Sequence, residues 1–401
     1  MIPMRLFVQT VKAYGGVFPV LIRLARRVTL RLFAHLQGVV SLWRRKTRIL
    51  LIAPGISDDD LADLAVRKAF YVPSMDWEIR HTEEVSLFEV VSSVPILYFG
   101  NVPKLDKMAV YRSATFNVDF RRNPMDGWEW CSVSEYCAER APDYKAAQQR
   151  FTRRVALLRE KGLKRCYVFG TGPSLAKALD REWEDGYKVV CNTIVRDKEL
   201  WQHLKPDFIA AGDAIYHFGF TEHACAFRRD LRDRLAETDT LFVYPGRFHE
   251  LVSREFDAFS GQLVPFPIGW YWGVNVDLTR NFCLPNMKNV LPLLLLPLAC
   301  TLARQVYLWG FDGRAPNDVL FWSNSPRHSY PEYMPQLQRA HPRFFDHHVP
   351  EKDPGRYVRD VHGDTLENAL TLAEQQGWRF VMMHPSWTPV LQKRYCEGRD
   401  R

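Results

Sequence analysis

Short apolar runs alternate with helical segments between residues 164 and 383, and this alternation restricts the fold more than any other feature of the chain. Strands are predicted at Lys164 to Phe169, Lys188 to Cys191, Asp207 to Ala211, Thr240 to Tyr244, Gln305 to Trp309 and Arg379 to Met383. Strands that alternate with helices form parallel sheets. The sequence therefore predicts an α/β fold with a doubly wound, mostly parallel, Rossmann-like sheet.

The first of these strands runs into a glycine-rich turn, Gly170-Thr171-Gly172-Pro173-Ser174, which opens a helix. Glycines allow a ligand to approach the backbone closely, Pro fits the first turn of a helix, and Ser caps its free N–H groups. Such a turn offers backbone N–H groups to a phosphate. It lacks the lysine of a Walker loop and the third glycine of a dinucleotide fingerprint, so an ordinary strand-to-helix turn is the alternative.

Polar residues follow the later strands where those strands end. Asn192 follows the second strand, Asp213 the third, and Asp312 the strand that ends at Trp309. In parallel sheets ligands bind beyond the carboxyl ends of the strands, so Ser174, Asn192 and Asp213 are expected to share one crevice.

An apolar run from Val290 to Ala303 precedes the strand at Gln305. It is shorter than the roughly 20 residues that cross a bilayer, which favours a buried helix, and its two prolines predict a bent or interrupted one. Lys288 and Asn289 stand just before this run and are candidate ligand-binding residues.

His362 lies immediately before a predicted helix from about Thr365 to Gln376. The positive end of a helix dipole favours a neutral imidazole, which accepts protons. A surface or capping histidine is the alternative.

The ordered set of these motifs resembles the bacterial sialyltransferases of glycosyltransferase family 42 and the related MptE-like group, which includes 6-hydroxymethylpterin diphosphokinases. The set comprises Gly-x-Gly-Pro-Ser, Cys-Asn after the second strand, a strand ending in Gly-hydrophobic-Asp, a His before a helix, and a last strand followed by Pro-Ser. The resemblance covers roughly Cys166 to Trp387.

The resemblance implies that Asn192 and the glycine-rich turn contact the nucleotide of a sugar donor. The residues of this turn are Gly170, Thr171, Gly172, Pro173 and Ser174. It implies that His362 is the general base toward the acceptor hydroxyl, and that Tyr330 and Tyr333 hold the leaving phosphate. Two departures leave the donor nucleotide open: Thr171 stands where the family has Asn, and residues 286–290 lack its Ser-Gly pair.

The first 46 residues have a different character. The whole chain carries 54 basic and 46 acidic residues, and up to Ser57 there are ten basic residues and no acidic one. On a helix, Arg23, Arg26, Arg27 and Arg31 fall opposite an apolar side. This pattern predicts a basic amphipathic helix suited to an anionic membrane surface, and a helix packed on the domain is the alternative. No nucleic-acid-binding module accompanies the charge, which disfavours nucleic acid as a partner.

The expected organisation is a basic amphipathic segment at 1–46, an N-terminal α/β region at 47–142 and a Rossmann-like catalytic domain at 143–392. The eight cysteines are scattered without a Cys-x-x-Cys pair, as in reduced cytosolic proteins.

Together these features predict a cytoplasmic glycosyltransferase of surface-polysaccharide biosynthesis, peripherally bound to the inner face of the membrane. Its substrates would be a nucleotide-sugar, with CMP as the nucleotide, and a cell-surface glycan precursor. No metal or other cofactor is required for that chemistry. The alternatives are an ATP-dependent diphosphokinase, which would use Mg²⁺ held by Asp213 and Asp312, and a non-catalytic nucleotide-binding protein of polysaccharide assembly.

Overall fold

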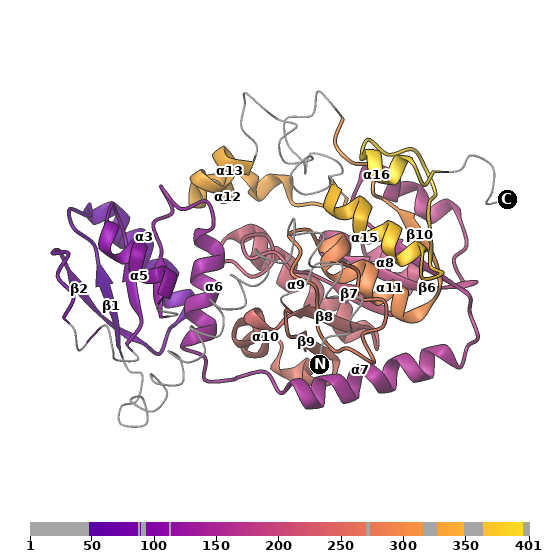
Figure 1. The fold of residues 1–401 in the computed structure, drawn as a ribbon, viewed down its shortest axis with the longest axis horizontal. Coiled ribbons are helices and arrows are strands. Elements are labelled where there is room, and N and C mark those ends of the chain that lie inside the picture. The colour runs from indigo at the N-terminus through magenta and orange to yellow at the C-terminus, as the bar shows by residue number, and fades with distance from the viewer. Residues whose placement is uncertain are drawn as a thin grey trace. The chain divides into compact units, whose positions relative to one another are not determined.

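A computed structural model describes residues 48–86, 89, 94–111, 114–269, 273–315, 327–348 and 364–395 of the chain. These residues divide into two compact units (Figure 1). The smaller unit contains the described residues up to Ala141 together with Gln338–His347, and the larger unit contains the other described residues from Pro142 onward. The expected 1–46 helix and His362 lie outside the described residues.

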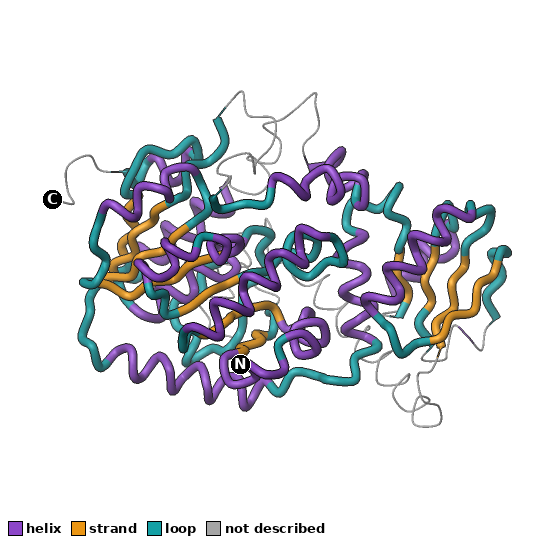
Figure 2. The backbone as a smooth tube through the Cα atoms, turned by 180° about the vertical axis from the view of Figure 1, so that it is seen from behind, coloured by secondary structure: helices purple, strands orange, loops and turns teal. Residues whose placement is uncertain are grey.

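The larger unit is built from alternating helices and strands (Figure 2). Its strands are β5 (Arg165–Phe169), β6 (Gly186–Cys191), β7 (Phe208–Ala210), β8 (Leu241–Pro245), β9 (Leu263–Phe266), β10 (Gln305–Trp309) and β11 (Arg379–Met382). Its α-helices are α7 (Tyr144–Arg159), α8 (Lys198–Leu204), α9 (Glu222–Glu237), α10 (His249–Glu255), α11 (Leu296–Leu302), α15 (Asp364–Glu374) and α16 (Pro389–Gln392). Short 3₁₀ and π segments are η1 (Pro173–Asp180), η2 (Asn192–Arg196), η3 (Gly246–Phe248), η4 (Asp257–Gln262), η5 (Leu291–Leu295) and η6 (Pro331–Tyr333).

The seven strands form one sheet in the order β11-β10-β5-β6-β7-β8-β9, and every neighbouring pair is parallel. From β5 the chain adds strands in one direction as far as β9, and it then returns to add β10 and β11 on the other side of β5. The doubly wound fold class is therefore confirmed. The direction of winding reverses between β5 and β10, and such reversal points are where open α/β sheets bind ligands.

Alternate residues of the strands face opposite sides of this sheet, as the two-residue period of a strand requires. One side packs against α7, α11 and α15, and its strand residues include Val168, Val189, Ala210, Val243 and Leu308. The other side is aromatic: the ring of Trp183 contacts Tyr167, Phe169 and Trp309 at centroid distances of 4.9 to 5.5 Å. Both faces are covered, which explains why the strands read as continuous apolar runs.

The buried helix before β10 is interrupted, in agreement with its two prolines. η5 is a π-helical turn in which the N–H of Leu296 donates to the carbonyl of Leu291, and α11 follows from Leu296. Pro297 has no N–H to donate to the residue four before it, so the regular α-helical pattern fails there and a wider turn takes its place.

The smaller unit is a second parallel α/β sheet, with strand order β2-β1-β3-β4. Its elements are β1 (Arg48–Ile52), α3 (Asp58–Tyr71), β2 (Asp76–Arg80), β3 (Ile96–Tyr98), α5 (Pro103–Tyr111), β4 (Thr115–Asn117) and α6 (Asp126–Tyr136). Ser57 caps α3, because its hydroxyl accepts the N–H of Asp60 at 3.2 Å.

The chain passes from the larger unit back into the smaller unit through two helices. α12 (Met334–Ala340) begins in the larger unit and ends in the smaller one, and α13 (Pro342–His348) belongs mostly to the smaller unit. The sequence does not predict this return of residues 338–347 to the first α/β unit.

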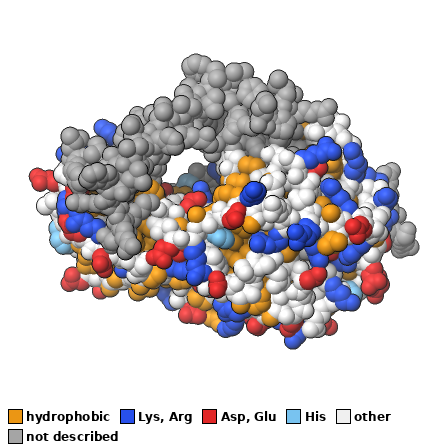
Figure 3. Space-filling model, turned by 90° about the horizontal axis from the view of Figure 1, so that it is seen from below, with side chains coloured by type: hydrophobic (Ala, Val, Ile, Leu, Met, Phe, Trp, Pro, Cys, Tyr) orange, Lys and Arg blue, Asp and Glu red, His pale blue; other side chains and the backbone are white. Residues whose placement is uncertain are grey.

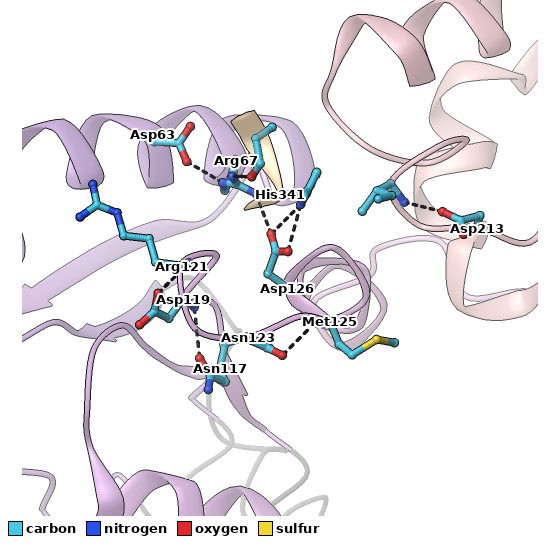
Figure 4. A network of polar contacts seen from close by, with 12 residues as sticks. Asp63, Arg67, Asn117, Asp119, Arg121, Asn123, Met125, Asp126, Asp213 and His341 are labelled. Carbon is cyan, nitrogen blue, oxygen red and sulfur yellow. Dashed lines mark hydrogen bonds and ion pairs between the residues drawn. The ribbon is translucent and has the colours of Figure 1, made fainter. Parts of the chain in front are cut away.

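A buried ionic network holds the returning segment within the smaller unit (Figure 4). The guanidinium of Arg67 donates to Asp126 at 2.9 Å and to the carbonyl of Ala340 at 2.5 Å, and Nδ1 of His341 lies 2.8 Å from the same Asp126 carboxylate. Arg67, Asp126 and His341 are all fully buried. The network explains why residues far apart in the sequence fold into one unit.

Lys, Arg, Asp and Glu side chains are interspersed over the face of the molecule that Figure 3 shows. Within the described residues, no helix is both long enough and apolar enough to cross a membrane. The seven described cysteines are all free thiols.

Candidate functional site

The carboxyl ends of five neighbouring strands of the larger unit lie along one edge of the sheet. Trp309 pairs with Phe169, Phe169 with Val190, and Ala210 with both Cys191 and Val243. β10, β5, β6 and β7 therefore end within about one residue of one another, and β8 continues two residues further, to Pro245. The residues that follow them in sheet order are Gly310 to Asp312, Gly170 to Ser174, Asn192, Gly212 and Asp213, and Gly246 and Arg247. The structure therefore brings Ser174, Asn192, Asp213 and Asp312 to the same edge, with Ser174 and Asp312 at the reversal point.

The turn after β5 is interlocked with the turn after β10. The hydroxyl of Ser174 donates to Asp312 Oδ2 at 2.8 Å, and the Ser174 N–H donates to Oδ1 at 3.2 Å. The N–H of Gly172 donates to the Gly310 carbonyl at 2.8 Å, and that of Gly170 donates to the carbonyl that ends β10 at 2.8 Å. Two segments more than a hundred residues apart thus share one hydrogen-bonded structure.

This close approach explains the glycines of both turns. A Cβ atom added to Gly172 would collide with the carboxylate of Asp312, and one added to Gly170 would lie 2.6 Å from the Gly310 carbonyl oxygen. Gly310 has a φ of +77°, which side chains other than Gly rarely adopt. The glycine pattern is therefore required by backbone packing, without any ligand.

The structure differs here from the expectation of a turn with free N–H groups. The N–H groups of Gly170, Gly172 and Ser174 all donate within the protein, and the carboxylate of Asp312 occupies the start of η1, where a phosphate was expected. Pro173 does take the first helical position, and Thr171 is half-buried between the two glycines. Ser174 does not cap the helix: Gly172 is the N-cap, and no side chain caps its N–H groups.

His384 completes the interlocked cluster. Its Nε2 accepts the Gly310 N–H at 2.9 Å and lies 2.7 Å from the Ser174 hydroxyl oxygen, while Nδ1 lies 2.8 Å from the Pro385 carbonyl. A ring nitrogen that accepts an N–H carries no proton, so the ring proton belongs to Nδ1. No role was predicted for His384 from the sequence, although it directly follows a predicted strand of the same sheet.

The loop after β11 is also fixed to the turn after β10. The hydroxyl of Ser386 donates to the carbonyl of Phe311 at 2.7 Å, and the N–H of Trp387 donates to the carbonyl of Asp312 at 2.6 Å. The Trp387 side chain is 61 % exposed. The backbone of this loop is therefore fixed, and the loop presents an aromatic side chain to solvent beside the carboxyl edge.

Asn192, at the end of β6, has an unusual conformation. Its φ is +51°, and its Oδ1 atom is buried with no hydrogen-bond partner in the described part of the chain. Asn tolerates the left-handed region better than most residues, and strained backbone of this kind concentrates at functional sites. An acceptor without a donor at this edge is suited to a ligand N–H or O–H group.

Asp213, at the end of β7, is poised to exchange a proton near neutral pH. One oxygen accepts the N–H groups of Ile215 and Tyr216 at 3.0 and 3.1 Å. Burial nevertheless raises the pKa of Asp213 to about 7, since these two bonds only partly offset the lost hydration. Its own N–H donates to Nδ1 of His217, whose pKa burial lowers to about 3 and which is therefore a neutral acceptor.

Lys288 and Asn289 lie at the start of η5. Lys288 is exposed. The Asn289 side-chain oxygen accepts the Leu291 N–H at 2.8 Å, and its carbonyl accepts the Leu293 N–H at 2.9 Å. Asn289 therefore caps the buried helix, and capping alone accounts for an Asn at this position.

The two tyrosines expected at the leaving phosphate lie in a segment anchored on η2 and α9. Tyr330 is 2 % exposed, and its hydroxyl donates to Asp230 at 2.7 Å. Burial raises the pKa of Tyr330, and Asp230 raises it further. Tyr333 is half-buried, with its ring 6.4 Å from that of Tyr330. The Tyr330 hydroxyl is thus engaged by a carboxylate, which repels a phosphate.

The anchoring continues on the amino-terminal side of Tyr330. Arg327 and His328 contact the carboxylate of Asp197 at 2.8 and 3.2 Å, and Thr193 donates to the carbonyl of His328. Although burial opposes it, hydrogen bonds from His328, Leu200 and Arg327 lower the pKa of Asp197 to about 2. The segment from Arg327 to Tyr330 is therefore held firmly by the residues that follow β6.

Arg247, directly after β8, is a further residue of this edge that the sequence analysis missed. It is half-buried, and its Nε atom is buried with no hydrogen-bond partner among the described residues. A basic residue directly after a strand that ends in Pro-Gly was the available signal.

No group of His, Cys, Asp and Glu side chains arranged to hold a metal ion is present within the described ranges. Comparison of the chain with protein-family models, with curated proteins and with solved structures finds no match in any of the three.

Proposed function

We propose that the larger unit is a glycosyltransferase that binds a nucleotide-sugar at the carboxyl edge of its sheet and transfers the sugar to a glycan acceptor. The observation that carries the proposal is the arrangement of Asn192 and Asp213 on adjacent strands beside the reversal point. An unsatisfied acceptor and a carboxyl with a pKa of about 7 stand there, at the edge where doubly wound sheets bind their ligands.

The chemistry requires two things of this edge. The acceptor hydroxyl must lose a proton, and a general base with a pKa near the working pH does this best. Asp213 meets that condition. His362, the base that the family resemblance implies, is the other candidate. The nucleoside phosphate that leaves must also be stabilised, which calls for fixed positive or hydrogen-bonding groups.

In this proposal the interlocked turns after β5 and β10 are a scaffold for the site. Because the N–H groups of Gly170, Gly172 and Ser174 are engaged, the turn fixes the relative positions of β5 and β10 and does not itself bind phosphate. CMP is the nucleotide that the resemblance implies. Because Thr171 stands where the family has Asn, the identity of the nucleobase has to be tested by experiment.

The diphosphokinase alternative depends on Asp213 and Asp312 as ligands of Mg²⁺. The carboxylate of Asp312 already accepts the hydroxyl and the N–H of Ser174. It would have to exchange these donors for a metal, whereas Asp213 has one oxygen without a donor among the described residues. The geometry therefore favours sugar transfer over the metal-dependent reaction.

A nucleotide screen separates these functions. Ligands that bind only the folded state raise its melting temperature, so CMP, CDP, UDP and ATP with Mg²⁺ can be ranked by thermal shift. Stabilisation by CMP or UDP, followed by release of that nucleotide from its sugar conjugate, is the expected result. A shift with ATP and Mg²⁺ alone would favour the diphosphokinase, and binding without turnover would indicate the non-catalytic protein.

The two candidate bases are distinguished by substitution. If Asp213 is the base, Asp213→Asn loses turnover and retains nucleotide binding, whereas His362→Ala leaves both unchanged. The opposite pattern would assign the base to His362. Loss of turnover in neither variant would contradict general-base catalysis by these residues.

We further propose that residues 1–46 bind the protein to an anionic membrane surface from the cytoplasm. The basis is the run of basic residues without an acidic one. A variant that begins at Gly38 should lose binding to vesicles containing phosphatidylserine while the full chain binds them. Equal binding of both proteins would refute the proposal.

A further inference from the structure

Arg247, which is half-buried, differs from the buried arginines Arg228 and Arg234 of the larger unit. Arg228 donates to Glu255 at 2.7 Å and to two backbone carbonyls, and Arg234 contacts Glu237 at 3.1 Å. For Arg247, the described residues provide neither a carboxylate, nor a carbonyl, nor an aromatic ring. Arg remains charged at all physiological pH values, so this side chain carries a partly desolvated charge without a counter-charge.

Such an arrangement is costly unless a ligand supplies the missing acceptors. Burying an N–H without a hydrogen bond is unfavourable, and burying an unpaired charge is more so. A planar guanidinium with several free N–H groups matches the oxygens of a phosphate in a two-point contact. Arg154 and Arg234 also have a buried Nε without a partner, but a carboxylate accepts from the Nη1 atom of each. Arg247 has no such carboxylate among the described residues, which points to an anion as its partner.

The position of Arg247 places that anion within the candidate site. Gly246 begins η3 directly after β8, and Pro245 lies close to Gly212, which precedes Asp213. Strands in a sheet are about 4.8 Å apart, so residues at the ends of β6 and β8, with β7 between them, are separated by roughly 10 Å. A long Arg side chain and an Asn side chain at that separation can contact one small ligand.

We infer that Arg247 binds a phosphate group and that Asn192 accepts a hydrogen bond from a hydroxyl or N–H group of the same ligand. This inference rests on the proposed function, and it names the phosphate-binding residue that the glycine-rich turn does not provide. A nucleoside phosphate carries both required groups: an anion for Arg247 and sugar or base donors for Asn192.

The surroundings are compatible with an anion. Asp213 lies on the strand between the two residues, where an ionised carboxylate would repel a phosphate. Burial raises its pKa to about 7, so a large fraction of Asp213 is neutral at that pH. The remaining, ionised fraction is the form that can act as the base of the proposed transfer reaction.

The test measures the binding of inorganic pyrophosphate, CMP and UDP to the full chain by titration calorimetry. Arg247→Gln should weaken all three ligands about 10- to 100-fold, the loss expected for a hydrogen bond to a charged group, and Arg247→Lys should weaken them less. Asn192→Gly, which keeps the left-handed backbone available, should weaken the nucleotides and leave pyrophosphate unchanged. The matched control is Arg280→Gln, since Arg280 is 88 % exposed and pairs with Asp277.

Thermal stability without ligand tells a ligand-binding arginine from a structural one. Removing a desolvated charge that has no partner should leave the melting temperature of Arg247→Gln equal to or above that of the wild type. A structural arginine would give a lower melting temperature, and that result would contradict the inference.

The outcomes also separate this inference from the proposed function. Unchanged pyrophosphate and nucleotide binding in Arg247→Gln would overturn the role of Arg247 while leaving sugar transfer intact. Arg247-dependent binding of phosphates without any sugar transfer would support the anion site and refute the glycosyltransferase. Absence of binding of all three ligands to the wild-type protein would overturn the anion site.

Discussion

The hydroxyl of Ser174 lies 2.8 Å from Oδ2 of Asp312, although 138 residues separate them in the sequence. The contact joins the turn after β5 to the turn after β10, at the point where the sheet reverses its direction of winding. His384, which follows β11, connects a third strand to this junction: its Nε2 atom lies 2.7 Å from the Ser174 hydroxyl oxygen and accepts the Gly310 N–H. The central strands of the larger unit are thus tied together at the edge where the candidate site lies.

Replacing Asp312 by Ala should destabilise the larger unit. The change leaves the Ser174 N–H without its acceptor and removes one of the two groups that the Ser174 hydroxyl contacts, a loss of about 1 to 3 kcal/mol. Hydrogen exchange at the amides of β5 and β10 is a suitable measurement, since it reports the larger unit alone. Glu184→Ala, at an exposed position of the same unit, is the control, and equal protection in the two variants would show that the junction contributes nothing.

Replacing Gly310 by Ala should be more harmful. The residue has a φ of +77°, and the new Cβ would collide with the backbone of Gly170. Both effects act on backbone atoms that cannot rotate away, so a loss of at least about 2 kcal/mol is expected.

The matched control for Gly310→Ala is Gly261→Ala. Gly261 has no atom within 4 Å of an added Cβ, and its φ lies outside the left-handed region. Its substitution should leave the thermal melting temperature unchanged or slightly raised. Similar melting temperatures for the two variants would mean that the two turns separate easily.

The alternation of apolar runs with helices was sufficient to predict the fold class and several elements within one or two residues. β10 was predicted from Gln305 to Trp309, as observed, and β11 ends one residue before the predicted Met383. Strands buried on both faces are continuous apolar runs with turn residues at each end, and such runs are local in the sequence. The strands β2, β4 and β9 were not predicted: β2 is polar, β4 has only three residues and β9 has four, one of them a proline.

The contents of the site were less predictable, because they depend on contacts between distant segments. The glycine-rich turn has the local sequence of an anion-binding loop, yet its N–H groups are consumed by Gly310 and Asp312. No local pattern reveals that partner. Nor does a local pattern reveal that Nε of Arg247 has no hydrogen-bond partner among the described residues, or that the Tyr330 hydroxyl donates to Asp230.

The buried network of the smaller unit gives a prediction of its own. In Asp126→Ala, Arg67 and His341 lose the carboxylate that both contact, and a fully buried guanidinium remains. Removing one partner of a buried ion pair costs about 3 to 5 kcal/mol. Amides of α3 and of residues 338–347 should therefore exchange faster with deuterium than in the wild type.

The control for Asp126→Ala is Arg48→Gln in the same unit. Arg48 pairs with Glu78 at 2.7 Å, but the two side chains are 48 % and 35 % exposed. Exposed pairs contribute about 0 to 1 kcal/mol, so the protection of α3 should be nearly unchanged. If only Asp126→Ala exposes residues 338–347, the network is what holds that segment in the smaller unit.

Asp213 links the stability of the larger unit to pH. Burial raises its pKa from 3.8 to about 7 in the folded protein, whereas the unfolded chain restores the ordinary value. Below about pH 4 both states are protonated, and the group costs nothing. As the pH rises from 4 to 7 the unfolded state ionises first, so the free energy of unfolding falls by about 1.4 kcal/mol per pH unit.

Asp213→Asn should remove this dependence, because an amide does not ionise and its oxygen still accepts the N–H groups of Ile215 and Tyr216. The variant and the wild type are expected to melt at similar temperatures near pH 4. The variant should then become progressively more stable than the wild type up to pH 7, and the difference should stay constant above that pH. Melting curves across this range measure the difference directly. A difference that does not change between pH 4 and pH 7 would mean that Asp213 ionises as it does in water, and Asp213 would then lose its role as the base of the proposed transfer reaction.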